Sequence, residues 1–446
     1  MPVDATLSSS RRLTKAIFWT KRGGLAVLDQ SLFAGAHFVL NILLARWLPA
    51  AEYGAFALAY SIFLLIATLH DALLIEPMMV FGAGKFAREE SWYVGIILRG
   101  HMLLTLPIVM LMALLAYPLA RFYTETVGLT FLALGLTMPL ILLLWMVRRV
   151  FYVRLHPGWA CLGSGFYFII VVALAYAGYG TEKLSPLSAV LVMGVASLSA
   201  SVVLLYRLSP QWRKPPSSEL SVRKVVLEHW RYGRWALASA IAMWFPLNIA
   251  YLALPAWWGI EETGALRALM NFLNPILQGL GALSLLLVPV LVRHRNGRGI
   301  AQVNRTLTRF LALLLGITGA YLLLLLLFRV QMFEILYANK YVEHSGLPFI
   351  LLILLPLAAC FTKCFGSGLR ALEQPSKVFR SYAIAAIFAV VLGLPLVKAY
   401  GILGASAGLA LSYVLIASSM FILYWRATGI ERTIGVGKTL NDWGTK

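Results

Sequence analysis

The sequence predicts an all-α integral membrane protein, with twelve transmembrane helices in two six-helix lobes related by pseudo-twofold symmetry. Composition, the spacing of apolar runs and an internal repeat support this fold class. The 446-residue chain is 60% hydrophobic and only 13% charged, and its mean hydropathy is +0.81. A soluble protein carries about 25% charged residues. The polar residues are therefore too few to cover a water-soluble globule.

Twelve apolar runs are long enough to cross a bilayer, which takes about 20 residues per helix. The expected spans lie near residues 23–47, 54–81, 94–119, 128–152, 159–179, 184–207, 233–256, 264–292, 306–329, 346–369, 377–398 and 401–426. An even number of spans places both chain ends on one side of the membrane.

Basic residues indicate which side that is. With the N-terminus in the cytoplasm, the inner segments hold thirty of the 38 Lys and Arg residues, and the outer segments hold six. Such a bias is typical of cytoplasmic loops, so we expect cytoplasmic N- and C-termini. The basic residues behind the formal net charge of +20 then set the topology of the chain and contact anionic membrane lipids. Nucleic acid is not an expected partner, because no loop is long enough to form a basic module.

The two halves of the chain resemble each other. Asn41 in the segment from Leu40 matches Asn248 in the segment from Leu247, and "EYGA" at Glu52 matches "ETGA" at Glu262. Six spans per half make the repeats parallel, related by an axis along the membrane normal. We expect an N-terminal lobe at 1–208, a cytoplasmic linker with an amphipathic segment at 209–232, and a C-terminal lobe at 233–446.

Polar residues lie inside the first, second, seventh and eighth expected spans, and those of the second are the charged candidates described below. Arg267, Asn271, Asn274 and Gln278 follow each other at spacings of four, three and four, which puts them on one helix face. The other candidates are Gln30, His37 and Asn41 on the first span and Asn248 on the seventh. Polar groups in hydrocarbon usually face a bundle interior or an aqueous cavity. We expect these eight residues to line a substrate cavity between the lobes; interhelical hydrogen bonding is the alternative.

Two further sets of charged residues are candidates. Asp71 and Glu76 lie well inside the second span, where a desolvated carboxylate can take up and release a proton. They are candidates for ion coupling, and a buried pair with His70 or a basic residue is the alternative. Candidates for binding a headgroup phosphate are Lys363, Arg149, Arg234 and Arg370, because guanidinium and ammonium groups suit phosphate oxygens. Positive-inside anchoring is the alternative for all but the deeper Lys363.

Catalytic motifs are missing from the sequence. "GVGKT" at 435–439 resembles the end of a phosphate-binding loop, but Arg432 stands where the earlier glycine is required and no strand precedes it. We therefore expect no enzyme activity, no cofactor and no metal site. Cys161, Cys360 and Cys364 all fall in expected spans and are expected to be packed as small hydrophobic residues.

The segment "LLARWLPAAEYGAFALAYSIFLL" (43–65) resembles the early segment of Wzx-type polysaccharide biosynthesis flippases. These belong to the multidrug/oligosaccharidyl-lipid/polysaccharide exporter superfamily. The matching residues run from Leu44, Ala45 and Arg46 through Leu48, Pro49, Glu52, Tyr53 and Gly54 to Phe56, Leu58 and Ala59. "GLRALEQPSK" (368–377) is similar to that family's turn after the tenth span.

The resemblance implies a MATE-like fold and a function. The expected substrate is an oligosaccharide on a polyprenyl pyrophosphate, moved from the cytoplasmic to the outer leaflet of a bacterial inner membrane by alternating access. Surface polysaccharides such as lipopolysaccharide or exopolysaccharide would be the product, and a polysaccharide polymerase and other assembly proteins are candidate partners. Many relatives lack a carboxylate in "ALLIEP" (72–77), so the role of Glu76 is not inherited. A MATE-like multidrug or cation antiporter is the alternative.

Overall fold

Helices make up the fold. The computed structural model describes residues 3–83, 85–208, 221–285, 287–372 and 374–443, and no strand occurs among them. The first half of the expected linker at 209–232 lies outside these residues, and its second half is helical from Val222 onward. The first half of the chain contains α1 (Val3–Trp47), α2 (Ala50–His70), a π-helical turn η1 (Asp71–Ile75), α3 (Glu76–Ala83), η2 (Ala87–Glu89), α4 (Glu90–Phe122), α5 (Glu125–Val153), α6 (Pro157–Gly180) and α7 (Pro186–Leu208).

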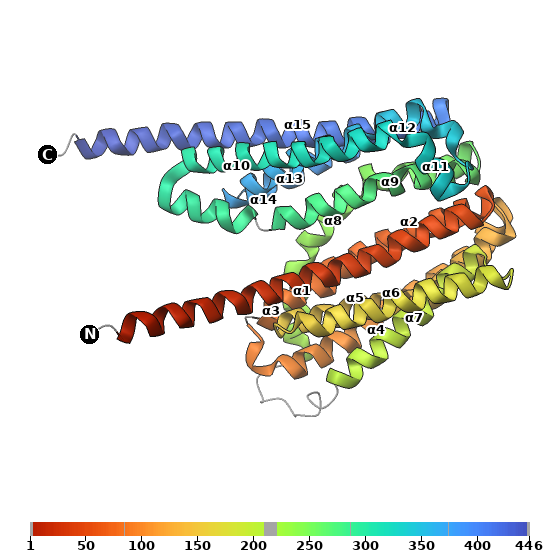
Figure 1. Ribbon diagram of the computed structural model, residues 1–446, viewed down its shortest axis with the longest axis horizontal. Coiled ribbons are helices and arrows are strands. Elements are labelled where there is room, and N and C mark those ends of the chain that lie inside the picture. The colour runs from red at the N-terminus through yellow and green to blue at the C-terminus, as the bar shows by residue number, and fades with distance from the viewer. Residues whose placement is uncertain (1–2, 84, 209–220, 286, 373, 444–446) are drawn as a thin grey trace. The chain divides into compact units, whose positions relative to one another are not determined.

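The second half follows the same pattern with more interruptions. It contains α8 (Val222–Trp257), α9 (Ile260–Leu285), α10 (Leu287–Leu327), α11 (Arg329–Tyr337), η4 (Val342–Ser345), α12 (Leu347–Leu352), α13 (Leu354–Ala371), α14 (Pro375–Phe388), η5 (Ala389–Gly393) and α15 (Leu394–Trp443). Figure 1 shows these helices along the chain.

Ten helical segments of the described chain are long and apolar enough to cross a membrane. The last of them, Ser376–Gly429, holds two expected spans. Gly401, with φ of 55°, separates these two spans, because a left-handed residue cannot continue an α-helix. The expected eighth span, around α9, is not among the ten. The predicted class, an all-α integral membrane protein, is confirmed.

Two prolines explain the two π-helical turns. The turn Asp71–Ile75 comes just before Pro77, and the turn Ala389–Gly393 comes just before Pro395. Proline has no backbone N–H and its ring clashes with the carbonyl four residues earlier. Widening of the preceding turn relieves that clash, and such π-bulges often lie at functional sites.

The chain divides into two compact units. Unit 1 consists of Met1–Leu44 and Ile62–Ala240, and unit 2 consists of Ala45–Ser61 and Ile241–Lys446. The helices α2 and α8 therefore each contribute residues to both units. The expected boundaries at 208 and 233 stay a prediction, and the units differ from them mainly in the placement of residues 45–61.

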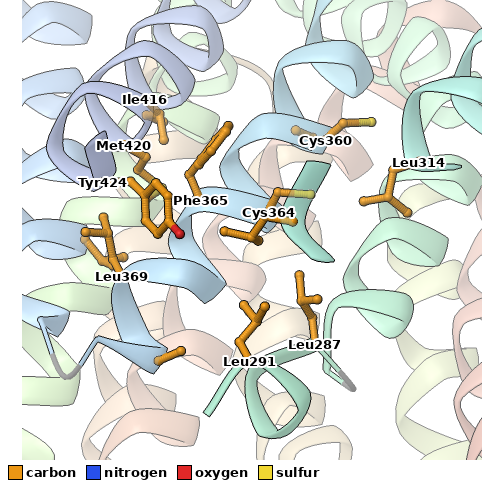
Figure 2. Close-up of a cluster of buried hydrophobic side chains, with 14 of the residues drawn as sticks. Leu287, Leu291, Leu314, Cys360, Cys364, Phe365, Leu369, Ile416, Met420 and Tyr424 are labelled. Atoms are coloured by element: carbon orange, nitrogen blue, oxygen red, sulfur yellow. The ribbon is translucent and has the colours of Figure 1, made fainter. Parts of the chain in front are cut away.

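The core of unit 2 surrounds α13. Figure 2 shows Phe365 beside Ile416, Met420 and Tyr424 of α15, with Cys364 on a neighbouring face. Phe365 and Tyr424 have ring centroids 5.4 Å apart. All three cysteines of the chain are free and buried. The apolar faces of α10, α13 and α15 thus form one continuous core.

Glycines of the repeated motif explain how unit 2 holds residues 45–61. A Cβ on Gly54 would collide with the backbone carbonyl of Ile260, and one on Gly264 would lie 3.0 Å from Gly54 N and from Ala50 O. Gly54 belongs to "EYGA" and Gly264 to its repeat mate "ETGA". The two motifs therefore meet, and their glycines let the backbones of α2 and α9 touch.

Candidate functional site

The polar stripe on α9 begins at a buried arginine in unit 2. The side chain of Arg267 is 8% exposed. Its Cζ atom lies 4.5 Å from the ring centroid of Tyr60, which is a cation–π contact. The guanidinium donates hydrogen bonds to the hydroxyl oxygens of Tyr60 and Tyr251, and Tyr53 also acts on it electrostatically. Phenols thus surround the charge.

Asn271 continues the stripe one turn further along α9. Its Nδ2 donates to the Tyr53 hydroxyl at 3.0 Å and to the Tyr337 hydroxyl at 3.4 Å. Tyr337 in turn donates to the backbone oxygen of Ala268 at 3.0 Å. Burial raises the pKa of Tyr337, so its hydroxyl stays protonated and remains a donor. These contacts hold Asn271, in the buried part of the stripe, in place.

The stripe becomes more accessible along α9. Arg267 and Asn271 are buried, Asn274 is half-buried and Gln278 is exposed. The next position at this spacing is Gly281, where an added Cβ would lie 4.0 Å from Lys363 Nζ on α13. The half-buried Lys363 therefore extends the polar face that the four α9 residues begin. The expectation that Lys363 lies deeper in the membrane than the other candidate cations stays a prediction.

Arg370 lies at the end of α13 and is exposed. It acts electrostatically on Lys363 and on Tyr382 of α14. Two of the four candidate headgroup cations thus lie near each other in unit 2. The other two, Arg149 and Arg234, belong to unit 1. Arg149 is half-buried, with Cζ 5.5 Å from the Tyr152 ring centroid, and Arg234 is exposed.

The stripe expected on the first span lies in unit 1 and is largely satisfied locally. Asn41 Nδ2 donates to the backbone oxygen of His37 at 2.8 Å. The His37 ring packs against Phe33 and Tyr167, at centroid distances of 4.9 and 5.6 Å. Gln30 is half-buried. The imidazole thus has an aromatic environment, and the role of these residues in a cavity stays a prediction.

The repeat mate of Asn41 behaves in the same way in unit 2. Asn248 Nδ2 donates to the backbone oxygen of Trp244 at 3.1 Å. In both asparagines the side chain bonds a carbonyl four residues earlier. This shared geometry agrees with the sequence match between them.

A buried ion pair in unit 1 was missed at the sequence level. Asp29 is fully buried and accepts from Arg148 Nε at 3.1 Å and from Arg148 Nη2 at 2.8 Å. Ser164 Oγ donates to the same carboxylate at 2.5 Å, and the Tyr152 hydroxyl donates at 2.6 Å. Asp29 and Arg148 are 119 residues apart in sequence. The signal in the sequence that could have revealed this pair is that Asp29 and Arg148 lie at similar depths in their expected spans.

The candidate ion-coupling residues lie at the π-helical turn. Asp71 is half-buried, and both Arg149 and Glu76 act on it electrostatically. Glu76 is exposed and accepts a hydrogen bond from the Tyr232 hydroxyl at 2.9 Å. The Glu76 side chain thus lies on the protein surface rather than in its interior. The coupling role of either residue stays a prediction.

His70, which the alternative interpretation pairs with a carboxylate unless a basic residue takes its place, instead contacts a second histidine. Its Nε2 lies 2.9 Å from His101 Nδ1, and His101 Nε2 lies 3.1 Å from the backbone oxygen of Pro139. His101 therefore donates from Nε2 to the carbonyl and accepts at Nδ1 from His70. Both rings are neutral in this arrangement.

The π-helical turn also binds the start of α8 within unit 1. Pro77 cannot donate to the backbone oxygen of Leu73, and that oxygen lies 3.1 Å from His229 Nδ1. His229 Nε2 lies 2.6 Å from the Tyr93 hydroxyl. Lys85 and Glu228 form an ion pair at 2.7 Å. The amphipathic segment predicted from the sequence is thus anchored on unit 1.

Comparison with known proteins identifies the fold. No family model matches the chain, and no curated protein matches it in sequence. A multidrug resistance transporter of the MATE family, of the MOP superfamily, is similar in structure, with a TM-score of 0.73 and 14% identity over 92% of this chain and 99% of that one. The lipid II flippase MurJ gives 0.69 and 10% identity over 96% and 93%.

A third structure differs in its pocket. It is a MOP-superfamily transporter from Pyrococcus furiosus, described as having a binding pocket of reversed polarity, with a TM-score of 0.62 and 15% identity over 92% of this chain and 95% of that one. The fold of this chain is therefore MATE-like, as predicted. At these identities the likeness concerns the fold.

Proposed function

We propose that this protein is a flippase that moves a polyprenyl-pyrophosphate-linked oligosaccharide from the cytoplasmic to the outer leaflet by alternating access. The polar face of unit 2 carries this proposal. It combines the cations Arg267 and Lys363 with the amides Asn271, Asn274 and Gln278, all within unit 2. Lys363 is the more accessible of the two cations and can bind the pyrophosphate. Arg267 is buried against phenols and adds positive charge to the face. Amides both donate to and accept from sugar hydroxyls.

A MATE-like cation antiporter is the second candidate, because Asp71 is a half-buried carboxylate at a π-helical turn. A cation substrate needs acidic groups that are free to bind it. The most buried carboxylate, Asp29, is instead occupied by four hydrogen bonds. The basic and amide-rich face of unit 2 favours an anionic, glycosylated substrate over a cation.

Several features of the flippase model rest on the resemblance of residues 43–65. These are the bacterial inner membrane, the cytoplasmic termini, the export of surface polysaccharide and the assembly with a polymerase. The lipid II flippase among the similar structures is a precedent for this class of substrate on this fold.

Reconstitution tests the proposal. Proteoliposomes are loaded with a polyprenyl-pyrophosphate-linked oligosaccharide, and a membrane-impermeant lectin reports glycan that reaches the far leaflet. We expect Lys363→Gln to lower the flipping rate at least about tenfold, since one charge-assisted contact to phosphate is lost. Lys398→Gln, on the opposite expected side of the membrane, is the matched control. A wild-type protein that moves no glycolipid but exports an organic cation would replace the flippase with the antiporter.

A further inference from the structure

An apolar groove runs between α13 and α15 in unit 2. It encloses about 510 Å³ and is lined by Leu357, Ala358 and Phe361 from α13 and by Val414, Ala417 and Phe421 from α15. The Ser418 hydroxyl is the polar exception in the lining. Ligand sites have volumes of about 300–1,000 Å³, so the groove is large enough for a ligand.

The groove lies in membrane-spanning helices and is open at its edge. Phe421 is 40% exposed and Ile422 is 48% exposed. Both helices belong to segments that are long and apolar enough to cross a membrane. The medium around these side chains is hydrocarbon, so the natural occupant is a lipid chain.

A row of aromatic rings connects the groove residues Phe361 and Phe421 with Phe365 and Trp425 beside them. Phe361 and Phe365 have centroids 6.3 Å apart, Phe365 and Phe421 are 5.0 Å apart, and Phe421 and Trp425 are 6.1 Å apart. Phe365 is the ring that Figure 2 shows beside Ile416 and Met420. Of these four rings, Phe421 and Trp425 are exposed, Phe361 is half-buried and Phe365 is buried, so the exposed part of the row continues from the groove to Trp425.

An exposed arginine follows the groove. Arg426 is one helical turn beyond Ile422 and is exposed, and it follows Trp425 directly. Trp and Arg together mark the level of lipid headgroups. The positive-inside pattern places this end at the cytoplasmic surface, where a substrate headgroup would enter. An apolar groove that ends in a cation suits a lipid with an anionic headgroup.

At the corresponding place in unit 1, two helices pack closely. The sequence repeat pairs α5 with α13 and α7 with the last part of α15. Gly194 of α7 packs directly on Thr137 of α5, because an added Cβ would lie 2.5 Å from Thr137 Cγ2. The repeat places Gly194 near Val414, which lines the groove. A close contact in unit 1 thus stands where the repeat places a residue that lines the groove of unit 2.

From these observations we infer that the groove binds the polyprenyl chain of the transported lipid, with Arg426 beside its phosphate. The inference rests on the proposed function and names where the substrate's tail is held. The tail of the proposed substrate is a lipid chain that the flippase must hold, and its anionic phosphate complements the charge of Arg426. The groove keeps the tail on the membrane side of unit 2 while the headgroup moves.

Photo-crosslinking tests this site. The full-length protein, in nanodiscs of phosphatidylethanolamine and phosphatidylglycerol, is exposed to a polyprenyl phosphate that carries a diazirine in its chain. Labelled peptides are then identified by mass spectrometry. We expect labels on residues 354–361 and 414–422. A diazirine-bearing phosphatidylglycerol serves as the second arm, and it should label these peptides weakly. Unlabelled polyprenyl phosphate should compete with the first probe, and unlabelled phosphatidylglycerol should not.

Groove-filling variants provide the matched comparison. Ala358→Trp and the milder Ala417→Leu should lower labelling about tenfold and about threefold, because they occupy the space that the chain needs. Leu313→Trp, at an exposed apolar position of α10, should label like the wild type. Equal labelling by both probes, or undiminished labelling of both variants, would overturn the inference.

The glycolipid flipping assay separates this inference from the proposed function. If the wild type and Ala417→Leu both flip the glycolipid normally and the groove carries no label, the groove inference alone is rejected. Groove labelling without any glycolipid movement rejects the flippase and leaves a polyprenyl-binding site. Slower flipping by Ala417→Leu, with a normal unfolding temperature, supports both.

Discussion

Arg148 in unit 1 and Arg267 in unit 2 are both buried on long helices, but their surroundings differ. Arg148 forms two hydrogen bonds with Asp29, and its Cζ lies 3.8 Å from the Phe33 ring centroid. Arg267 lies against Tyr60 and hydrogen-bonds phenols. The Asp29 carboxylate therefore neutralises the charge of Arg148. The phenols around Arg267 are neutral, so they solvate its positive charge without neutralising it.

Under the proposed function, this difference gives the two repeated units different roles. The ion pair of unit 1 connects α1, α5 and α6 through Asp29, Arg148 and Ser164, so it holds three helices together. The polar face of unit 2 keeps its positive charge and becomes more accessible toward Gln278 and Lys363. We interpret unit 1 as the more rigid unit and unit 2 as the one that carries the substrate face.

The largest effect should follow from breaking the ion pair. We expect Asp29→Ala to lower the free energy of unfolding by about 3–5 kcal/mol, because Arg148 is left buried without its carboxylate. Arg267→Gln should cost only about 1–2 kcal/mol, since it removes hydrogen bonds to neutral phenols. Unfolding in detergent, followed by circular dichroism or calorimetry, measures both. The double variant Asp29→Leu/Arg148→Met should recover much of the loss. Equal costs for the two single variants would remove the contrast between the units.

The contact of the two repeated motifs gives the next effect. We expect Gly54→Ala to destabilise the protein by about 3 kcal/mol, because the new methyl group overlaps the backbone of α9 and forces the helices apart. Gly95→Ala is the matched control, since nothing lies within 4 Å of its added Cβ. That substitution should be neutral or slightly stabilising through helix propensity. Similar unfolding temperatures for the two variants would contradict the close crossing.

A smaller effect compares the two equivalent helix pairs. We expect Gly194→Ala in α7 to cost about 1–2 kcal/mol by overpacking against Thr137. Ala417→Leu, in the groove of unit 2, should leave the free energy of unfolding almost unchanged because space is available there. Thermal unfolding of the two variants side by side provides the measurement. A greater loss for Ala417→Leu would show that the groove is closed in the membrane.

The smallest effect concerns the two candidate coupling residues of unit 1. We expect Glu76→Gln to leave the pH profile of transport unchanged, because Glu76 is exposed and the lost hydrogen bond to Tyr232 is worth only about 1 kcal/mol. Asp71→Asn, at the half-buried position, should shift that profile. Transport measured between acidic and alkaline pH checks both variants, with Tyr232→Phe as the control. A changed profile for Glu76→Gln alone would move the coupling role from Asp71 to Glu76.

The motif that suggested a family turned out to be structural. Arg46 donates to the backbone oxygen of Ile335, and Tyr53 accepts from Asn271. Lys340 donates to the backbone oxygens of Arg46 and Leu48, at 2.6 and 2.8 Å. Burial lowers the pKa of Lys340, and nearby Arg46 lowers it further. These residues attach 45–61 to unit 2. The motif therefore identifies the fold, and it carries no information about the glycan.

The sequence by itself determined the fold class, because apolar content and span length depend only on local composition. It also placed Arg267, Asn271, Asn274 and Gln278 on one face, because that follows from the period of a helix. Tertiary structure decided their surroundings: which end is buried, which phenols meet Arg267, and that Lys363 extends the face. It also decided the Asp29–Arg148 pair. Contacts between distant segments depend on how helices pack. Helical periodicity in a single sequence shows which residues share a face, and it does not show which helices pack against that face.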